Sequence, residues 1–511
     1  KRARARIVEL LGASGDLLGE PRPISHVVKF YERGERPLEI VSSKQWFVRS
    51  LELRGALQAR GRELEWHPPF MQGRFQSWVD GLSSDWNISR QRFFGVPFPI
   101  WYRVGEDGEA IEGAFVLAEE GELPVDPSTD VPEGFEASER NRPGGFCGDP
   151  DVMDTWATSS LTPQIAGGWL DDPEQFARVF PMDLRPQGHD IIRTWLFSSV
   201  VRSELEHHEL PWAHTAISGW ILDPDRKKMS KSKGNVAVPI EPIEQFGTDA
   251  VRYWALSARL GVDTAYDTQQ MQVGRRLAIK ILNVSRFVLS LAEPGGPTAE
   301  PGAGGPRGVF EPVDSALLGR LSDLIGATTA CFESYEHARA LELCETFFWS
   351  FCDDYVELVK ARAYGGSSEL ATASARSCLV VTLSVLLRLF APFLPYCTEE
   401  AWSWSHDGSI HLEAWPGPGE LGGPGARASL EPGLHGALLE TVYEVLAALR
   451  RAKSERHLSM RAPVARLSVR GPDDKIALLE QAKGDLMDAG TIAEAELSPG
   501  EGAELAIEVE I

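Results

Sequence analysis

The sequence has 511 residues, which corresponds to about three domains at roughly 100–200 residues each. Charged residues make up 24% and hydrophobic residues 43%, which is ordinary for a globular protein and excludes wholesale disorder. The formal net charge is −23, from 51 Lys and Arg against 74 Asp and Glu. This charge excludes a general affinity for nucleic acid, so local basic patches would have to bind any polyanion.

Residues 1–40 are rich in Arg, Gly and Pro and end in an alternating stretch, 38–41, that predicts a short strand. From 41 to 275, strand-like and helix-like segments alternate, which is typical of an α/β layer fold with parallel strands. Three strand-like runs stand out, and each is expected to end in a turn or loop rather than a hairpin: Val96–Tyr102, Met182–Arg185 leading into Gly188, and Thr215–Leu222.

Residues 276–420 form the next predicted part, in which apolar residues recur three and four apart and indicate a helical bundle. Its predicted helices cover 271–291, 314–332, 335–363 and 368–402. Two Gly/Pro-rich stretches, 294–308 and 416–426, predict a loop and a linker. The last part, 427–511, is predicted to contain a basic helix at 435–456, a strand at 464–469, a helix at 474–488 and a final strand at 505–511.

No membrane span or export signal is expected. The most apolar stretch, Leu379–Leu394, contains Thr382, Ser384 and Arg388. The opening Lys-Arg-Ala-Arg-Ala-Arg is followed by no apolar signal segment. The six cysteines lack the paired spacing of a zinc site and are interpreted as buried residues of a reduced protein. We therefore expect a cytoplasmic protein.

The sharpest chemical signal is the stretch 226–235, Arg-Lys-Lys-Met-Ser-Lys-Ser-Lys-Gly-Asn, in which five of ten residues are cationic. Its serines can donate hydrogen bonds, and its glycine lets the backbone approach a ligand closely. Its lysines can stabilise the negative charge that develops on phosphoryl oxygens. The stretch therefore predicts a polyphosphate-binding loop, with a solvated basic turn as the alternative.

Within that loop, Lys-Met-Ser-Lys-Ser at 228–232 is identical to the second signature of the class I aminoacyl-tRNA synthetases. Three further stretches, 87–95, 151–156 and 185–195, resemble the valine branch of this family, with the isoleucine branch as its nearest relative. The resemblance implies that Lys228 and Lys231 stabilise phosphate charge and that Ser230 and Ser232 share the catalytic loop.

The resemblance also implies an architecture for the four parts of the chain. Residues 1–40 would be a remnant of an inserted editing domain with its return strand, and 41–275 the second half of a Rossmann-type catalytic domain. Residues 276–420 would be an all-α anticodon-binding domain, and 427–511, which the resemblance covers only loosely, a small C-terminal α/β domain.

Gly188-His189-Asp190 lies where a strand is expected to end and a helix to begin. Ligands bind at such carboxyl ends of open parallel sheets. Glycine would let a nucleoside approach the backbone, and a carboxylate can accept hydrogen bonds from both ribose hydroxyls. The resemblance implies ATP binding by these three residues. A helix N-cap is the simpler alternative.

Ile191 and Trp195 are four residues apart, so on a helix they would share a face. Together with Trp156 they could form the wall of a small apolar pocket, and the resemblance places the amino-acid pocket at these positions. A bulky Trp195 favours valine over isoleucine, although such a pocket rejects threonine only about a hundredfold. The alternative is that these side chains belong to the core.

Two family features are absent from the sequence. No histidines have the spacing of the first class I signature, His-x-Gly-His, and most of the editing domain is missing. The chain is therefore expected to be the C-terminal part of a longer protein. Where relatives often have cysteine pairs near 30–40 and 103–148, only His26 and Cys147 occur, so we predict no structural zinc and no metal ligands.

A basic stretch follows the linker. In so acidic a chain, cations on and after one helix are plausible contacts for a tRNA backbone, and a solvated face is the alternative. The predicted tRNA-binding residues are Arg450, Arg451, Lys453, Arg456 and Arg461.

The sequence therefore predicts an ATP-dependent ligase that joins valine to tRNA(Val), with Mg²⁺ accompanying the substrate phosphates. Its partners would be tRNA(Val), valine and ATP, it would not bind membranes, and it would be a monomer. Three alternatives stay open: an isoleucyl-type branched-chain synthetase, a non-catalytic tRNA-binding fragment or paralogue, and, less well supported by the helical half, an unrelated nucleotidyltransferase.

Overall fold

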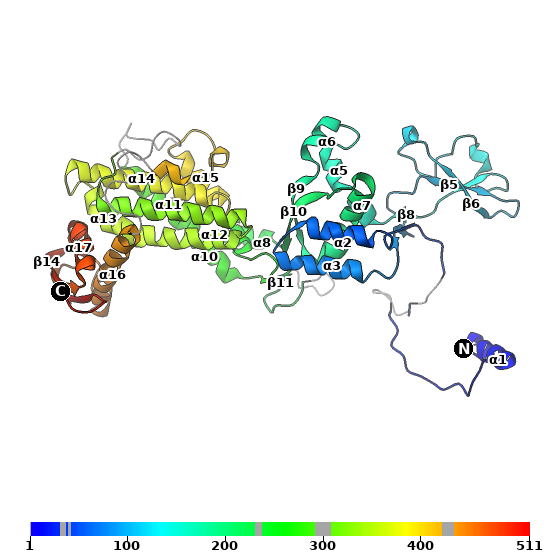
Figure 1. The fold of residues 1–511 in the computed structure, drawn as a ribbon, viewed down its shortest axis with the longest axis horizontal. Helices are drawn as coiled ribbons and strands as arrows, with labels where there is room; N and C mark the ends of the chain where they lie inside the picture. Colours follow the sequence, from blue (N-terminus) through cyan, green and yellow to red (C-terminus); the bar gives the residue numbers. More distant parts are fainter. Residues whose placement is uncertain (1, 31–36, 39–41, 230–237, 292–307, 422–433) are drawn as a thin grey trace. The chain divides into compact units, whose positions relative to one another are not determined.

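The computed structural model describes residues 2–30, 37–38, 42–229, 238–291, 308–421 and 434–511 (Figure 1). The chain divides into two compact units. The first contains residues 1–49 and 84–155, and the second contains residues 50–83 and 156–511. Residues 294–307 of the predicted loop, residues 422–426 of the predicted linker and residues 39–41 of the predicted strand lie outside the described residues.

The first unit is built from short antiparallel pairings. Its largest sheet has the order β6-β5-β7, in which the central strand β5 (Ile100–Val104) pairs antiparallel with both neighbours, β6 (Ala110–Leu117) and β7 (Phe146–Gly148). The run predicted at Val96–Tyr102 was therefore wrongly expected to end without a hairpin. The turn begins at Gly105 and contains Gly108 at φ 80°, a left-handed conformation that glycine adopts without strain.

The other elements of this unit are small. The basic segment 2–14 forms a helix that the sequence analysis did not predict, although Ala, Arg and Leu are good helix formers. The remaining bounds are α1 (Arg2–Ser14), β1 (Phe47–Val48) paired with β3 (Trp86–Asn87), β4 (Ser89–Arg90) paired with β8 (Val152–Met153), and the 3₁₀ turns η2 (Glu120–Glu122) and η3 (Ala137–Glu139).

The second unit contains the parallel sheet that the sequence predicted. Its order is β2-β10-β9, and both pairings are parallel: β2 (Glu65–His67), β10 (Trp212–Ser218) and β9 (Met182–Gly188). A second parallel pair joins β11 (Ile221–Leu222) to β12 (Thr264–Ala265). Parallel pairing needs a crossover connection, and helical segments lie between β9 and β10.

Helices accompany this sheet. Helices α2 (Arg54–Glu63) and α3 (Gln72–Asp80) lie side by side (Figure 1). Their Leu57, Phe75 and Val79 side chains are fully buried. The other helical segments are η1 (Pro69–Met71), α4 (Thr155–Ser159), α5 (Thr162–Gly167), α6 (Pro173–Val179), η4 (His189–Ile191), the π-helix η5 (Ile192–Leu196), α7 (Phe197–His207), α8 (Ile240–Phe246) and α9 (Thr248–Leu256).

The predicted helical bundle is present, and its long helices run side by side (Figure 1). It comprises α10 (Thr268–Leu291), α11 (Pro312–Glu333), α12 (His337–Ser350), the π-helix η7 (Phe351–Tyr355), α13 (Val356–Ala363), α14 (Glu369–Phe390), α15 (Pro395–Ser403) and the 3₁₀ turns η8 (Ile410–Leu412) and η9 (Pro418–Leu421). Among the described helices, α14 alone is long and apolar enough to span a membrane, but 67% of its apolar window is buried. It is therefore the central core helix of the bundle.

The last part of the chain is a small α/β unit whose core is continuous with that of the bundle. It contains α16 (Leu434–Glu455), β13 (Val464–Gly471), α17 (Asp473–Gln481), α18 (Lys483–Gly490), β14 (Ile492–Pro499) and β15 (Ala506–Glu510). The single helix predicted at 474–488 is two helices, and strand β14 was not predicted. Its sequence alternates apolar and polar residues from Ala493 to Leu497, but four of its residues are Ala or Glu, which form strands poorly, and most of its side chains are exposed or half-exposed.

Candidate active site

The carboxyl edge of the parallel sheet carries the Gly-His-Asp turn. Gly188, the last residue of β9, lies opposite Ser218, the last residue of β10, and His189 begins the 3₁₀ turn η4. A β-carbon added at Gly188 would lie 2.7 Å from a carboxylate oxygen of Asp190, so a larger residue at 188 would require this carboxylate to move. The Asp190 side chain is exposed and can accept hydrogen bonds from a ligand.

The cationic loop at 226–235 (the lysine loop) begins beside the same edge of the sheet. The turn at Asp223–Lys227 is closed by a hydrogen bond from the Lys227 amide to the Asp223 carboxylate, and it returns Lys228 to a bridge with Leu222. There the Lys228 ammonium lies 4.0 Å from the centre of the Trp220 ring, a cation–π contact. The predicted catalytic residues Ser230, Lys231 and Ser232 lie outside the described residues.

Trp220 joins the two motifs. The His189 ring lies 4.5 Å from the Trp220 ring, on which Lys228 also packs. The Trp220 amide donates to Asp263 at 2.8 Å, and the same carboxylate oxygen lies 3.8 Å from Nε2 of His189. Residues 188–190 and the beginning of the lysine loop, separated by about forty positions in the sequence, therefore meet at one place.

His189 is buried, with 7% of its surface exposed. Burial is the main cause that lowers its pKa, and the positive charge of Arg74 adds to this effect, while Asp263 opposes it. The lowered pKa favours a neutral imidazole at pH 7, which has one donor and one acceptor nitrogen.

A signal that the sequence analysis missed is Gln187, which precedes Gly188 on β9. Within the described part of the chain, both side-chain amide atoms of buried Gln187 lack hydrogen-bond partners, as do both ring nitrogens of His189. Buried polar atoms normally have partners, so unsatisfied groups beside a strand end indicate a ligand site. Only burial reveals this, since nothing in the sequence context distinguishes this glutamine.

Two residues predicted for the amino-acid pocket, Trp156 and Trp195, lie on segments that contact each other. The Trp195 indole N–H donates to the Ser159 carbonyl at the end of α4 at 3.1 Å, and the Arg185 guanidinium lies 3.5 Å from the Trp195 ring centre. Trp195 thus lies against the helix that carries Trp156, and both side chains are half-buried. The contact of Trp156 with Ile191 stays a prediction.

The segment that carries Ile191 and Trp195 is not the α-helix that the sequence analysis assumed. Ile191 ends the 3₁₀ turn η4 and Trp195 lies in the π-helix η5, where the Phe197 amide bonds to the Ile192 carbonyl. Single π-turns occur frequently at functional sites, because they re-aim side chains within a helix.

The basic stretch at the end of α16 is less exposed than predicted. The Lys453 ammonium is buried and donates to the Met460 and Gly490 carbonyls at 2.9 and 2.8 Å, so the expectation that Lys453 contacts tRNA is corrected. Arg450 forms an ion pair with Asp354 at 2.7 Å. The exposed cations of the predicted set are Arg451, Arg456 and Arg461.

Comparison with known families agrees with this arrangement. Residues 29–267 match the family "tRNA synthetases class I (I, L, M and V)", and residues 314–469 match "Anticodon-binding domain of tRNA ligase". The chain therefore belongs to the class I aminoacyl-tRNA synthetases.

Within this family, the chain is similar to curated valine–tRNA ligases. It is 56% identical to that of Thermobifida fusca over 100% of this chain and 56% of the relative. It is 54% identical to that of Salinispora tropica over 96% of this chain and 58% of the relative. It is 51% identical to that of Leifsonia xyli over 99% of this chain and 57% of the relative. The chain thus spans a little over half the length of these relatives.

Solved structures share the fold. One match is a LeuRS of Agrobacterium radiobacter in a ternary complex with tRNA, with a TM-score of 0.52 and 22% identity. The aligned region covers 66% of this chain and 42% of the LeuRS chain. Another match is the Mycobacterium tuberculosis methionyl-tRNA synthetase in complex with methionyl-adenylate, with a TM-score of 0.51 and 22% identity. The aligned region covers 73% of this chain and 65% of that synthetase chain. These likenesses support the predicted fold class.

Proposed function

We propose that this chain is part of a valine–tRNA ligase and supplies its ATP-binding edge, its valine pocket and its tRNA-binding helical domain. The single observation that carries the proposal is the meeting of Gly188-His189-Asp190 with Lys228 across Trp220 at the carboxyl edge of the parallel sheet. The high identity to valine–tRNA ligases makes an isoleucyl-type specificity the less favoured alternative.

The reaction has two steps. A carboxylate oxygen of valine attacks the α-phosphorus of ATP, which forms valyl-adenylate and releases pyrophosphate. A terminal ribose hydroxyl of tRNA(Val) then attacks the acyl carbon, which forms the ester and releases AMP. In the first step negative charge moves onto the leaving pyrophosphate, so preorganised cations lower the barrier.

The residues of the edge have distinct proposed roles. The Gly188 backbone lets the adenosine approach, the exposed Asp190 carboxylate accepts hydrogen bonds from the ribose, and the neutral His189 ring lies against Trp220 beneath them. Lys228 and Lys231 stabilise the phosphate oxygens, with Ser230 and Ser232 donating from the same loop. Mg²⁺ would enter with the substrate phosphates rather than in a site built by protein ligands.

Specificity for valine would come from Trp156, Ile191 and Trp195. Because Trp195 is held by its bond to Ser159 and by the stacked Arg185, it would form a rigid wall that leaves little room for an additional methylene. The exposed Arg451, Arg456 and Arg461 would contact tRNA phosphates, in a monomeric cytoplasmic enzyme.

The test replaces Lys231 in a longer protein that contains both this chain and the His-x-Gly-His signature. Lys231→Ala is expected to lower kcat for valine-dependent ATP–pyrophosphate exchange by roughly a hundredfold or more, which corresponds to about 3 kcal/mol, with little change in the KM for valine. The matched control is Lys227→Ala, because exposed Lys227 lies in the same loop and pairs with Asp225 at 3.4 Å. An unchanged kcat in the Lys231 variant, or equal losses in both variants, would contradict the proposed role.

A further inference from the structure

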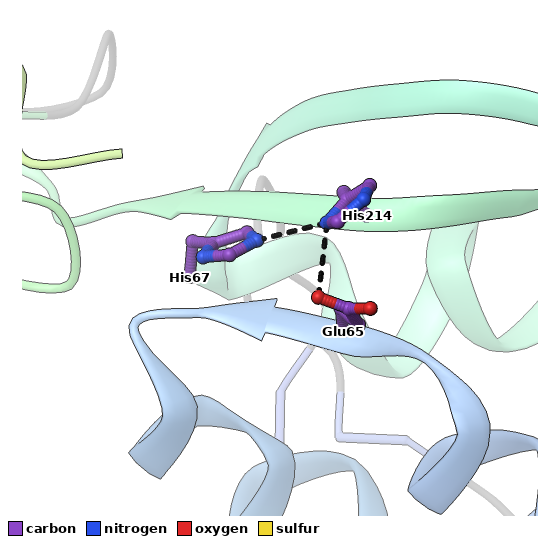
Figure 2. A group of neighbouring side chains, drawn as sticks. All are labelled: Glu65, His67 and His214. Carbon is purple, nitrogen blue, oxygen red and sulfur yellow. Dashed lines mark hydrogen bonds and ion pairs between the residues drawn. The ribbon is translucent and has the colours of Figure 1, made fainter. Parts of the chain in front are cut away.

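Glu65, His67 and His214 gather on one face of the parallel sheet (Figure 2). Successive side chains alternate across a strand, so Glu65 and His67 share a face of β2. The parallel register places His214 of β10 opposite Glu65, which brings its ring to the same face. The two imidazoles, 147 positions apart in the sequence, thus become neighbours beside one carboxylate.

The distances within this cluster suit a small tetrahedral ion. Nε2 of His67 lies 3.1 Å from Nδ1 of His214, and that nitrogen lies 3.4 Å from a carboxylate oxygen of Glu65. All three potential ligand atoms lie within 4.8 Å of one another. Zinc–nitrogen and zinc–oxygen bonds of about 2.0–2.1 Å in a tetrahedron separate neighbouring ligand atoms by about 3.3 Å, so the two shorter distances already match.

The surroundings hold the two rings in place and leave access. The His67 ring stacks on Tyr335 at 3.8 Å, and the His214 ring lies 5.6 Å from the same tyrosine. His67 also lines a cavity of about 630 Å³ whose wall includes Tyr335 and Glu336, which offers a path for an ion and its waters. The Glu65 side chain is 67% exposed, so its carboxylate can move toward an ion at little cost.

We propose that Glu65, His67 and His214 bind one divalent transition metal ion, with Zn²⁺ the best match, and with water as the fourth ligand. Zinc accepts both imidazole nitrogens and carboxylate oxygens as ligands. The sequence-based expectation of no zinc considered cysteine pairs and Cys/His spacing, and this site contains no cysteine.

The site is structural rather than catalytic. His214 lies four residues before Ser218, so at about 3.3 Å per residue the ion would be about 13 Å from the carboxyl edge of the sheet. It would cross-link β2 to β10 and fix the His67 ring against Tyr335 between α11 and α12. This inference does not rest on the proposed aminoacylation activity.

The test is a Co²⁺ titration of the 511-residue chain after dialysis against a chelator, followed through the visible absorption of tetrahedral Co²⁺ and its displacement by Zn²⁺. We expect one saturable equivalent. His67→Ala and His214→Ala should each weaken binding at least about tenfold, the lower end of what even an outer partner of a metal ligand contributes. His208→Asn is the matched control, because His208 also faces a carboxylate, Glu204 at 3.9 Å, and asparagine tolerates its φ of 55°.

Two results would overturn the proposal: no saturable binding by the unmodified chain, or equal binding by the His67 and His214 variants and the control. If a histidine variant fails to fold by circular dichroism, Glu65→Gln replaces it, since that exposed side chain is not part of the core. Zn²⁺ should raise the Tm of the unmodified chain by mass action and raise that of Glu65→Gln less. An equal rise in both proteins would exclude this site.

Discussion

Replacement of Arg362 should strongly destabilise the bundle, because this one side chain forms two ion pairs away from solvent. The guanidinium of Arg362 in α13 bonds both carboxylate oxygens of Asp314 in α11, at 2.7 and 2.8 Å, and both of Asp485 in α18, at 2.9 Å each. It thereby ties the C-terminal unit to the bundle. Arg362 is 4% exposed and Asp314 is fully buried, so water cannot replace these bonds.

The expected magnitude follows from what remains after the change. Arg362→Met keeps the length of the side chain but leaves the Asp314 carboxylate without its cation, although Tyr355 and Ser374 still donate to it at 2.7 and 2.6 Å. Removing one partner of a buried pair costs about 3–5 kcal/mol, because the remaining charge stays desolvated. We expect a loss in that range for the bundle transition.

The measurement is urea unfolding followed by the helical circular dichroism signal, with the slope checked against that of the unmodified protein. The control is Arg339→Met, which breaks an exposed pair with Glu342 and should leave the midpoint almost unchanged. Combining Arg362→Met with Asp314→Leu and Asp485→Leu should recover much of the loss, because no buried charge is then left unpaired. A loss below about 1 kcal/mol for Arg362→Met, the size of a surface pair, would refute the reasoning.

Three further predictions concern the proposed pocket, two histidines and the 511-residue chain by itself. Trp195→Ala is tested in a longer protein that also contains the His-x-Gly-His signature. It should raise kcat/KM for pyrophosphate exchange with isoleucine, relative to valine, by the equivalent of about 1–3 kcal/mol. Equal losses of kcat/KM for both amino acids would assign Trp195 to the core. Burial lowers the pKa of His189 and of His337, so the unfolded chain binds more protons than the folded chain below about pH 6.5. The Tm should therefore be highest above that pH and should fall as the pH drops through the folded pKa values. The variant His337→Gln should show a smaller fall in Tm between pH 7.5 and 5.5, about one unit on either side of 6.5. The 511-residue chain alone should retain tRNA on a filter weakly and less at higher salt, and should fail to exchange pyrophosphate because its sequence lacks the His-x-Gly-His pattern; robust exchange would contradict this.

The helical half was predictable because its signal is local. Apolar residues three and four apart over about twenty residues predicted α10, α11 and α14 close to their observed starting points. Short strands gave a weaker signal: a run such as β5 has the same composition in a parallel and an antiparallel sheet, so its hairpin with β6 was missed. Strand β14 was missed because its alternating residues are mostly Ala and Glu, which favour helices over strands.

The sequence by itself determined the family resemblance, the cationic loop that includes Lys228 and the strand-end turn at Gly188, because these depend on residue types at fixed local spacing. Only the tertiary structure decided which of these residues are exposed, which are buried and which lie together. In the folded chain, Lys228 and His189 both pack against the Trp220 ring. The Lys453 ammonium donates hydrogen bonds to two backbone carbonyls instead of facing solvent. The tertiary structure also brought His67 beside His214. The physical reason is that parallel strand pairing and burial join residues far apart in the chain, and no local pattern specifies which distant residues will share a face of the sheet.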